Sequence, residues 1–461
     1  MHTSPQNATI IGAGLVGSLL GLYLAKKGNK VAIYERRPDM RKASIAAGRS
    51  INLALSDRGW RALEGIGIGE DIRKVAIPMY KRVMHDTKGN LTSQPYGKEG
   101  QAIYSVSRGG LNMALMDLAE TNPDISLHFN QQVTNLDLKT NTLEFHNPET
   151  SQDTRLQSER IFGADGAFSA VRLALQKTER FQYSQSYLEY GYKELTIAPG
   201  ENGTWQLEKN ALHIWPRGQY MMIALPNLDG SFTCTLFFPY EGQHSFSALK
   251  TEADVMKFFQ EVFPDAVPLM PTLLEDYFGN PTGTLVTVKC FPWSFEDKVL
   301  LIGDAAHAVV PFYGQGMNAG FEDCSVLNEL MEAHENDWET IFKTFEKVRK
   351  PNADAIADLA VENFIEMRDK VADPRFLLQK KIEAKINARY PEQWIPLYTM
   401  VTFTPDMPYA KALKNGRKQE KIMKKLMQLI ETEADFEKPE VQQMLERKMT
   451  EKFSLNHETN V

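Results

Sequence analysis

The spacing of apolar residues near the N-terminus predicts a strand, a helix and a second strand. The short apolar run Thr9–Ile11 precedes a helix-like pattern from Ser18 to Lys27, and a further apolar run, Val31–Tyr34, follows Gly28. Apolar runs of this length on either side of one helix are typical of parallel strands in a βαβ unit, and a glycine after the last helical residue commonly ends the helix. We therefore expect an α/β domain at the start of the chain.

The pattern changes between residues 183 and 290, where strand-like runs dominate around one helical stretch near Glu252–Phe263. Beyond Asp323 the apolar spacing is chiefly helical, and the chain ends in a Lys- and Glu-rich amphipathic segment. These features predict a mainly antiparallel sheet inserted between two parts of the α/β domain, followed by a helical region. The expected strands of the inserted sheet are Tyr190–Ile197, Ala211–Pro216, Tyr220–Pro226, Phe232–Phe238 and Thr284–Phe291.

Composition narrows the class of protein. The 461 residues carry a formal net charge of -7, which gives no general attraction to nucleic acid or anionic lipid. The three cysteines are far apart, which fits a reducing compartment better than a disulfide framework, and without CxxC, HExxH or a close histidine pair we expect no metal site. The first strand begins too early to leave room for a signal peptide, and no run of about 18 apolar residues occurs.

The turn after the first strand carries a dinucleotide-binding motif. Gly12 permits a tight turn, Gly14 lets backbone amides approach a pyrophosphate beside Leu15, and Gly17 allows close packing of helix on strand. Glu35 ends the second strand, where it can accept both ribose hydroxyls of an adenosine. The adjacent Arg36 and Arg37 are either a solvated surface pair or contacts to the dinucleotide.

A second glycine cluster, Gly65-Ile-Gly67-Ile-Gly69, has the wrong spacing for a nucleotide site and follows no strand. We interpret it as a loop after a helix over Asp57–Leu63. The chain therefore has one predicted dinucleotide site and no second Rossmann unit for a nicotinamide cofactor.

A further candidate cofactor seat follows the apolar run Val299–Ile302. The residues after this expected strand are Gly303-Asp304, then Pro311, Gly314 and Gly316, with a helix-like pattern from about Met317. A strand, an approachable loop and a helix N-terminus together can bind an anion or a cofactor. Alone, the segment could equally be an ordinary βα connection, but the similar turn Gly163-Ala-Asp165-Gly166 after another apolar run strengthens the cofactor interpretation.

Spacing alone leaves two interpretations open for Arg108 and for a group of residues near position 365. Arg108 stands near the start of a helix expected to run to about Glu120, where a cation opposes the helix dipole. A nearby anion would explain it, and simple solvent exposure is the alternative. Asn363, Glu366 and Met367 share one helical face, which either lines a polar pocket or faces solvent.

Taken together, these motifs resemble the class A flavoprotein aromatic hydroxylases, and internal blocks up to about residue 410 look like the kynurenine 3-monooxygenases among them. The shared motifs are GxGxxG with Glu35, Gly163–Gly166 and Leu301–His307. The more specific blocks are Arg49–Ser56, Gln94–Gly97, Gly191–Leu195, Ala211–Pro216, Met222–Asp229, Pro311–Asn318 and Tyr398–Phe403.

The resemblance implies FAD as bound cofactor and NADPH and molecular oxygen as co-substrates in the conversion of L-kynurenine to 3-hydroxy-L-kynurenine. The family reaction proceeds through a flavin C4a-hydroperoxide, within tryptophan degradation and NAD synthesis. Because the ring amine of kynurenine activates the ortho position, no protein base is expected, and the protein mainly positions the ring and excludes water. The residues expected at the cofactor are Gly12, Gly14, Leu15, Gly17, Glu35, Arg36, Leu53, Ala54, Arg108, Asp304, Gly316, Met317 and Asn318.

The resemblance also assigns the substrate pocket. Arg82 and Tyr96 would grip the amino-acid carboxylate, and Phe312 in the loop Pro311–Tyr313 would lie between substrate and flavin. The remaining expected contacts are Asn363, Glu366, Met367 and Tyr398.

The implied fold is an α/β protein with a Rossmann-like FAD-binding domain, an inserted mainly antiparallel substrate domain and a helical C-terminal region. The predicted FAD-binding parts are residues 1–180, with a substrate-contacting segment at about 78–104, and 291–350. The inserted sheet spans 181–290, and the helical region, which contributes to the substrate pocket, spans 351–461.

Mammalian and fungal members of the family carry an apolar C-terminal anchor, whereas residues 411–461 here are charged. We therefore expect a cytoplasmic enzyme without a membrane anchor, and association of the tail with liposomes would count against it. The oligomeric state stays open, with a homodimer as one option. Two alternatives compete with this interpretation: an FAD hydroxylase of another aromatic acid, which should lack the Arg82 and Glu366 pairs, and a non-catalytic FAD-fold binding protein, which would not need the loop at Pro311–Asn318.

Overall fold

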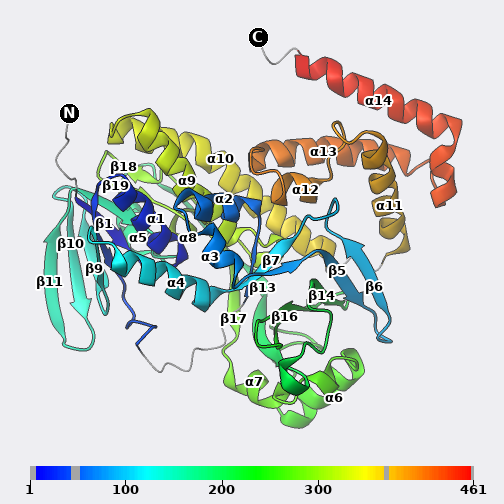
Figure 1. Cartoon of the computed structure of the whole chain (residues 1–461), viewed down its shortest axis with the longest axis horizontal. Coiled ribbons are helices and arrows are strands. Elements are labelled where there is room, and N and C mark those ends of the chain that lie inside the picture. The colour runs from blue at the N-terminus through cyan, green and yellow to red at the C-terminus, as the bar shows by residue number, and fades with distance from the viewer. Residues whose placement is uncertain (1–6, 43–51, 368–372, 458–461) are drawn as a thin grey trace.

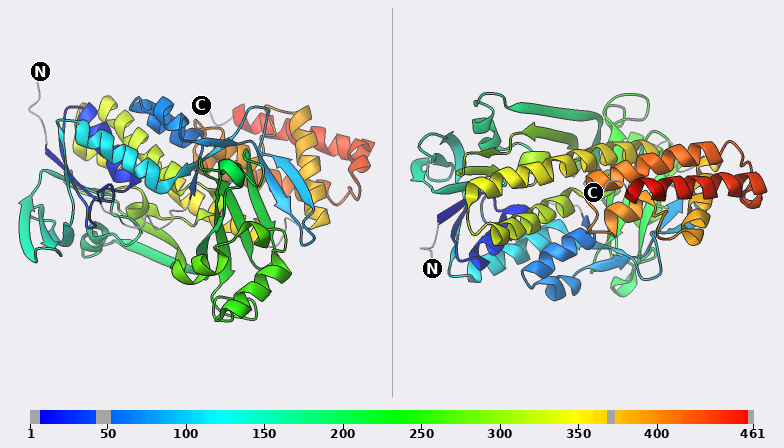
Figure 2. Two further views of the ribbon diagram at one scale, coloured as in Figure 1. Left: turned by 60° about the horizontal axis from the view of Figure 1, so that its bottom comes forward. Right: turned by 90° about the horizontal axis from the view of Figure 1, so that it is seen from above.

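The computed structural model describes residues 7–42, 52–367 and 373–457. A six-stranded sheet with its helices and a seven-stranded sheet lie side by side, and helices α11–α14 gather at the opposite end from the small β9–β11 sheet (Figure 1). Seen from above, the long helix α10 (Trp338–Ile365) runs from the six-stranded sheet to the C-terminal helices (Figure 2). The Arg49–Ile51 part of one family-like block lies outside the described residues.

The six-stranded sheet confirms the predicted βαβ unit. Its order is β18-β19-β12-β1-β2-β8, parallel except for β18 against β19. The central strands are buried on both faces, as their uninterrupted apolar sequences predict. The bounds are β1 (Asn7–Ile11), β2 (Lys30–Tyr34), β8 (Ile125–His128), β12 (Arg160–Gly163), β18 (Ser294–Phe295) and β19 (Val299–Leu301).

Helices on this sheet complete one large apolar core. Those that contribute to it are α1 (Leu15–Lys26), α2 (Asp57–Gly65), α3 (Gly69–Arg73), α4 (Arg108–Thr121), α5 (Ala170–Leu175), α8 (Asp304–His307), α9 (Gly316–Ala333) and the first half of α10. Gly65 ends α2 and Gly69 begins α3, so the predicted loop is limited to the three residues between these helices, with Gly67 at its centre. Two small antiparallel sheets flank this region: β9 (Gln132–Asp137), β10 (Thr142–Asn147) and β11 (Gln152–Gln157), and β3 (Asn52–Leu55), β7 (Ile103–Ser107) and β4 (Ile77–Met79).

The seven-stranded sheet is mainly antiparallel, as predicted, and has the order β17-β13-β16-β15-β14-β5-β6. Only β14 and β5 pair in parallel. Its strands are β13 (Gln182–Ile197), β14 (Ala211–Pro216), β15 (Met221–Pro226), β16 (Phe232–Pro239), β17 (Gly283–Phe291), β5 (Lys81–His85) and β6 (Leu91–Pro95). The last two come from the segment before α4, so the sheet brings residues near 82 beside residues near 212.

Both faces of this sheet are covered, because successive side chains of a strand point to opposite faces. On β16, Leu236 and Phe238 pack into a core with α6 (Glu252–Val262) and α7 (Leu273–Gly279), while Phe237 packs on the other side against η3 (Pro311–Tyr313) and α10. The short helices η1 (Glu201–Gly203) and η2 (Val267–Leu269) lie in the connections. The second face therefore meets the cofactor-side loop predicted from sequence.

A buried histidine pair ties β5 to β14 beneath this sheet. His213 is 1% exposed, and its Nε2 lies 2.9 Å from the carbonyl of Glu208, which can only accept. Burial lowers the pKa of His213 to about 4, so its Nδ1 accepts from His85 Nε2 at 2.9 Å. His85 Nδ1 in turn lies 2.7 Å from Asp265 Oδ2. This chain fixes the strand that carries Arg82.

The free energy of unfolding should therefore decrease in mildly acidic solution. The pKa of His213 in the folded protein is about 4, below the ordinary value of 6.5, so the unfolded chain binds the proton more readily. The stabilisation that is present above pH 6.5 is therefore lost as the pH falls toward 4. At pH 5 the loss is about 2 kcal/mol. Thermal unfolding between pH 7.5 and 5.0 measures it, and His213→Gln, which keeps both hydrogen bonds but does not titrate, should flatten the profile. An equally steep profile in that variant would contradict the assignment.

The C-terminal region is helical, as predicted. It comprises α11 (Pro374–Arg389), α12 (Leu397–Thr402), α13 (Tyr409–Leu426), η5 (Glu433–Glu437) and α14 (Pro439–His457), and its own apolar core includes Trp394 and Ile430. The predicted border at residues 350 and 351 falls inside α10, which continues through Pro351. The division into domains stays a prediction. Within the described part of the chain, no helix is long and apolar enough to cross a membrane.

Candidate cofactor and substrate site

The GxGxxG turn packs against the second glycine turn. Gly12 has a φ of +106°, and a Cβ there would lie 2.5 Å from the Ala164 carbonyl oxygen. A Cβ at Gly17 would lie 1.9 Å from the Gly12 oxygen. Nothing lies within 4 Å of a Cβ at Gly14, and no side chain caps the N-terminus of α1 beside Leu15. The turn is therefore closed on its protein side and open at Gly14.

Glu35 at the end of β2 holds this turn. Its Oε2 accepts the Ala13 N–H at 3.0 Å, and its Oε1 accepts the backbone N–H and Nε of Arg37 at 3.1 and 3.2 Å. Arg37 therefore pairs with Glu35, while Arg36 is exposed. The geometry leaves both interpretations of Arg36 open.

The two Gly-Asp turns lie at the carboxyl ends of neighbouring strands, β12 and β19. Asp165 caps α5, since its carboxylate accepts from Ser169 Oγ at 2.5 Å and from the Ala170 N–H at 2.7 Å. Asp304 is exposed at the start of α8, and Arg108, exposed at the start of α4, is close enough for the two charges to interact. Of the two aspartates, only Asp304 has its carboxylate available to a ligand.

A buried ion-pair network fixes the turn before Asp304. Asp323 Oδ2 accepts the Gly303 N–H at 3.0 Å and lies 2.6 Å from His307 Nε2, while Arg349 Nε donates to Oδ1 at 2.7 Å. Burial opposes ionisation of Asp323, but His307 and Arg349 outweigh it and lower its pKa. The carboxylate stays charged and holds the turn in place.

The N-terminus of α9 faces the end of β3. No side chain caps this helix, so the N–H groups of Gly316, Met317 and Asn318 have no intrahelical partner. Leu53 and Ala54 lie opposite on β3, both half-buried. The Asn318 side chain joins the two elements: its Nδ2 donates to the carbonyls of Ala54 at 2.9 Å and Gly314 at 2.8 Å, and its Oδ1 accepts the Ser56 N–H at 2.9 Å. Its side chain is thus bonded to the protein, so a ligand at this helix end would meet the backbone N–H of Asn318.

Asn318→Ala should therefore destabilise the loop and the flavin seat together. Three hydrogen bonds are lost, at about 1 kcal/mol each, which gives about 3 kcal/mol of unfolding free energy. Urea titration of the FAD-loaded protein measures the loss. Asn328→Ala is the control, because Asn328 is a half-buried asparagine of the same helix whose Nδ2 donates to Glu332 at 3.2 Å and not to β3. A difference below about 1 kcal/mol between the two variants would show that Asn318 does not hold β3 to α9.

These elements fit FAD. The open backbone at Gly14 and the uncapped N-terminus of α1 suit a diphosphate, because helix N-termini stabilise negative charge. Asp304 and Arg108, whose charges interact, offer an exposed carboxylate and an exposed guanidinium to a ligand. The α9 N-terminus suits the negative charge of a reduced flavin.

The predicted substrate residues also come together, around a stack of tyrosines. Tyr398 of α12 lies between Tyr96, which follows β6, and Tyr313 of η3, with ring centroids 5.4 and 5.6 Å apart. The Arg82 guanidinium of β5 lies over the rings of Tyr398 and Tyr96, at 4.5 and 5.0 Å. The Tyr96 hydroxyl is buried and has no hydrogen-bond partner among the described residues. The Arg82 guanidinium and this Tyr96 hydroxyl therefore lie together among aromatic rings.

The end of α10 approaches the same place through Phe312. Asn363 Nδ2 donates to the Phe312 carbonyl at 2.6 Å and lies 3.3 Å from the Met367 sulfur, so these two side chains share a face toward η3. The Phe312 ring is 7% exposed and packs between Phe237 and Phe364. At Asn363 and Met367 this helical face is therefore packed toward η3, and its part in a substrate pocket stays a prediction.

Lys380 was missed in the sequence analysis. It lies on α11, with its Nζ 3.6 Å from Glu366 and 3.3 Å from Glu383. Burial opposes its charge, but the two glutamates outweigh this and raise its pKa, while Arg82 is near enough to act against them. Nothing in the local sequence distinguishes this lysine from its neighbours, because only the packing of α11 brings it to Glu366.

Comparison with known proteins gives the family. Residues 6–360 match the FAD binding domain family model. The chain is 52% identical to the kynurenine 3-monooxygenase of Flavobacterium johnsoniae, over 96% of this chain and 98% of that protein. It is 47% identical to that of Dictyostelium discoideum (91% and 92% covered) and 45% identical to that of Anopheles gambiae (93% and 88% covered).

Solved structures share the fold at low sequence identity. The tetrameric form of 2-methyl-3-hydroxypyridine-5-carboxylic acid oxygenase is 19% identical, with a TM-score of 0.66 over 81% of this chain and 95% of that chain. The p-nitrophenol 4-monooxygenase of Pseudomonas putida is 18% identical, with a TM-score of 0.65 over 88% and 98%. The glycine turns fit FAD, and the family model and these relatives show the family. The chain belongs to the kynurenine 3-monooxygenase family of FAD-dependent aromatic monooxygenases.

Proposed function

We propose that this enzyme hydroxylates L-kynurenine at ring carbon 3, using bound FAD, with NADPH and molecular oxygen as co-substrates. The observation that carries the proposal is the Arg82 guanidinium held over Tyr96 and Tyr398 beside Tyr313, with Glu366 approaching from α10. A cation, an anion and aromatic surface match an amino acid with a flat ring: Arg82 receives the carboxylate, Glu366 the ammonium group, and the tyrosines the ring.

We assign each part of FAD to the residues described above. Gly12, Gly14, Leu15 and Gly17 receive the diphosphate, Glu35 the ribose, and Arg36 the outer side of the dinucleotide. Arg108 and Asp304 take the phosphate and ribityl portion. Leu53 and Ala54 face the ring from β3, and the backbone of Gly316, Met317 and Asn318 faces it from α9.

Bound FAD supplies electron transfer from NADPH and the activation of oxygen, one atom of which enters the ring while the other leaves as water. The residues of the chain supply position and shielding. Arg82 and Tyr96 anchor the amino-acid end, so that the ring is directed toward η3 and α9. Buried Phe312 and Tyr313 keep water from this space. Burial raises the pKa of Tyr96 and of Tyr313, so both hydroxyls stay protonated and act as hydrogen-bond donors.

The deciding experiment follows NADPH oxidation by the purified FAD-loaded protein, with and without kynurenine, and identifies the product. Acceleration together with 3-hydroxykynurenine supports the proposal. Acceleration with only hydrogen peroxide would make kynurenine an effector and not a substrate. Faster turnover with an aromatic acid that lacks the amino-acid side chain would favour a different hydroxylase, and a yellow protein that never oxidises NADPH would refute catalysis.

We further propose that the enzyme works in the cytoplasm, as its charged C-terminal segment suggests. Fractionation of cells and light scattering of the purified protein test the location and distinguish a monomer from a homodimer. The domain division at residues 180, 290 and 350 is best tested by limited proteolysis.

A further inference from the structure

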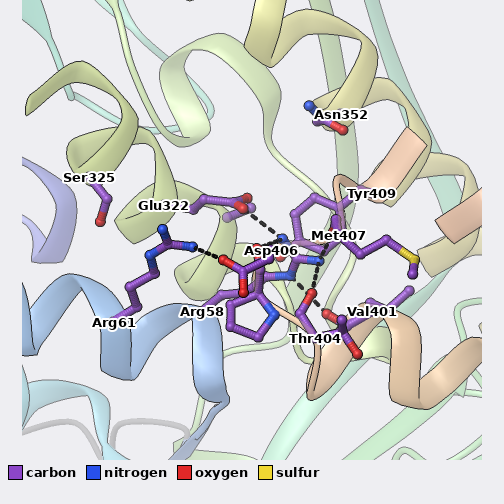
Figure 3. Close-up of polar contacts among 12 residues, drawn as sticks. Arg58, Arg61, Glu322, Ser325, Asn352, Val401, Thr404, Asp406, Met407 and Tyr409 are labelled. Carbon is purple, nitrogen blue, oxygen red and sulfur yellow. Dashed lines mark hydrogen bonds and ion pairs between the residues drawn. The ribbon is translucent and has the colours of Figure 1, made fainter. Parts of the chain in front are cut away.

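A second arginine, Arg58 of α2, lies buried beside residues 401–409 (Figure 3). Its side chain is fully buried, and its donors are directed at the last turn of α12 and at the connection that follows this helix. Nε donates to the Val401 carbonyl at 2.8 Å, and the two terminal nitrogens donate to the carbonyls of Met407 at 2.5 Å, Thr404 at 3.3 Å and Pro405 at 3.4 Å. One carbonyl from the last turn of α12 and three from the connection between α12 and α13 thus converge on one guanidinium.

The residues that Arg58 holds lie close along the chain to Tyr398, a proposed substrate contact. Tyr398 lies in α12, one turn before Val401, so the position of Val401 sets the position of the ring that lies under Arg82. Tyr409, at the other end of the connection, places its ring 4.0 Å from the Arg58 guanidinium carbon. Both ends of residues 401–409 are therefore fixed to α2.

The same contacts reach the flavin side. The Tyr409 hydroxyl donates to Gln315 Oε1 at 2.9 Å, and Gln315 is the residue before α9. Arg58 also donates to Glu322 on α9 at 2.6 Å, and the other oxygen of Glu322 accepts from Arg349 at 2.8 Å. The buried charge of Arg58 is therefore paired with the half-buried carboxylate of Glu322. Arg58 thus joins the helix that faces the flavin to the segment that carries Tyr398.

We propose that Arg58 is a positioning residue for the hydroxylation, which sets the distance between the α9 N-terminus and the ring of Tyr398. The inference rests on the proposed function. A planar guanidinium can donate in several fixed directions at once, which lysine cannot reproduce. Because the reacting ring must lie within a narrow distance of the flavin, a small displacement of α12 should impair kynurenine binding and coupling before it impairs FAD binding.

Arg61→Met is the matched control. Arg61 lies one turn later on α2, is half-exposed, and pairs with Asp406 of the same connection at 2.9 Å (Figure 3). We expect Arg58→Met to retain FAD, to raise the KM for kynurenine on the order of tenfold to a hundredfold, and to lower the product formed per NADPH. Arg61→Met should stay within about twofold of the unaltered protein. Arg58→Lys should recover little of the lost coupling.

The outcomes separate positioning from simple stability. If Arg58→Met loses thermal stability but keeps the KM and coupling of Arg61→Met, the inference is overturned. If Arg58→Met does not fold, Tyr409→Phe decides, because it removes only the hydrogen bond to Gln315: a raised KM with FAD retained supports the inference, and an unchanged KM overturns it.

If the unaltered protein shows no kynurenine-dependent NADPH oxidation, the proposed function fails, and hydrogen–deuterium exchange of residues 397–409 in the FAD-loaded protein tests the placement alone. Faster exchange in Arg58→Met than in Arg61→Met supports it, and equal exchange overturns it.

Discussion

Replacing Arg82 with methionine should weaken kynurenine binding by about 2–4 kcal/mol, or about 30- to 900-fold in Kd. Methionine keeps most of the packing between Tyr96 and Tyr398 but removes the charge and the fork of donors. The loss is large because the substrate carboxylate would then enter an aromatic pocket without a partner. FAD binding should not change, since the Arg82 guanidinium lies against Tyr96 and Tyr398, which are predicted substrate residues and not cofactor residues.

The Kd is measured by titrating kynurenine into the oxidised flavoprotein and following the flavin absorbance. Lys81→Met is the matched control, because Lys81 precedes Arg82 on β5 and forms only a surface pair with Glu208 at 2.9 Å. Arg82→Lys should recover less than half of the lost free energy, because a single ammonium cannot reproduce the planar contact with two rings. An unchanged Kd in Arg82→Met would remove this residue from the substrate site.

Gly17→Ala should abolish FAD binding. The new methyl group would lie 1.9 Å from the Gly12 oxygen, so α1 could not stay packed on the turn that the diphosphate needs. Gly14→Ala should act differently. Its φ of -76° suits alanine and its Cβ meets nothing within 4 Å, so the apoprotein should keep its stability while the methyl group occupies the space of the cofactor.

Both effects are measured from the FAD content of the purified variants and from the FAD Kd of the apoproteins, together with thermal unfolding. Gly67→Ala is the control: its φ of +85° makes alanine unfavourable by about 1–2 kcal/mol, but the residue lies in the loop between α2 and α3 and has no neighbour within 4 Å of a Cβ. It should lower stability and leave FAD affinity unchanged. Gly14→Ala protein that binds FAD normally would contradict the assignment of the diphosphate to this turn.

The apolar pattern predicted a helix or strand correctly where that pattern matches the faces that the fold buries. The apolar run before Gly12 forms a buried parallel strand because both faces of that sheet are covered, and the alternating run at residues 232–238 forms a strand between two cores. Bounds were less accurate where long-range pairing decides them. Strand β13 begins at Gln182, eight residues before the expected start, because β17 pairs with this polar stretch.

The roles of single polar residues depended on contacts that no local pattern contains. Asn318 was expected at the flavin, yet its side chain bonds Ala54, Ser56 and Gly314. Asp165 and Asp304 follow similar glycine turns, but the Asp165 carboxylate accepts hydrogen bonds from Ser169 and from the first N–H of α5, whereas Asp304 is exposed. A side-chain amide or carboxylate bonds whichever group the fold places nearest, so its partner is decided by packing.

The sequence by itself determined the glycine turns, the parallel strands that carry them and, through resemblance, the residues expected around FAD and kynurenine. These depend on steric rules that act over a few residues: only glycine tolerates the φ of Gly12, and only apolar runs fill the central strands. The tertiary structure alone decided that β5 joins the inserted sheet, that Lys380 meets Glu366, and that Arg58 binds the connection after Tyr398. Those contacts join residues separated by tens to hundreds of positions, and their geometry arises only when the separate cores pack against one another.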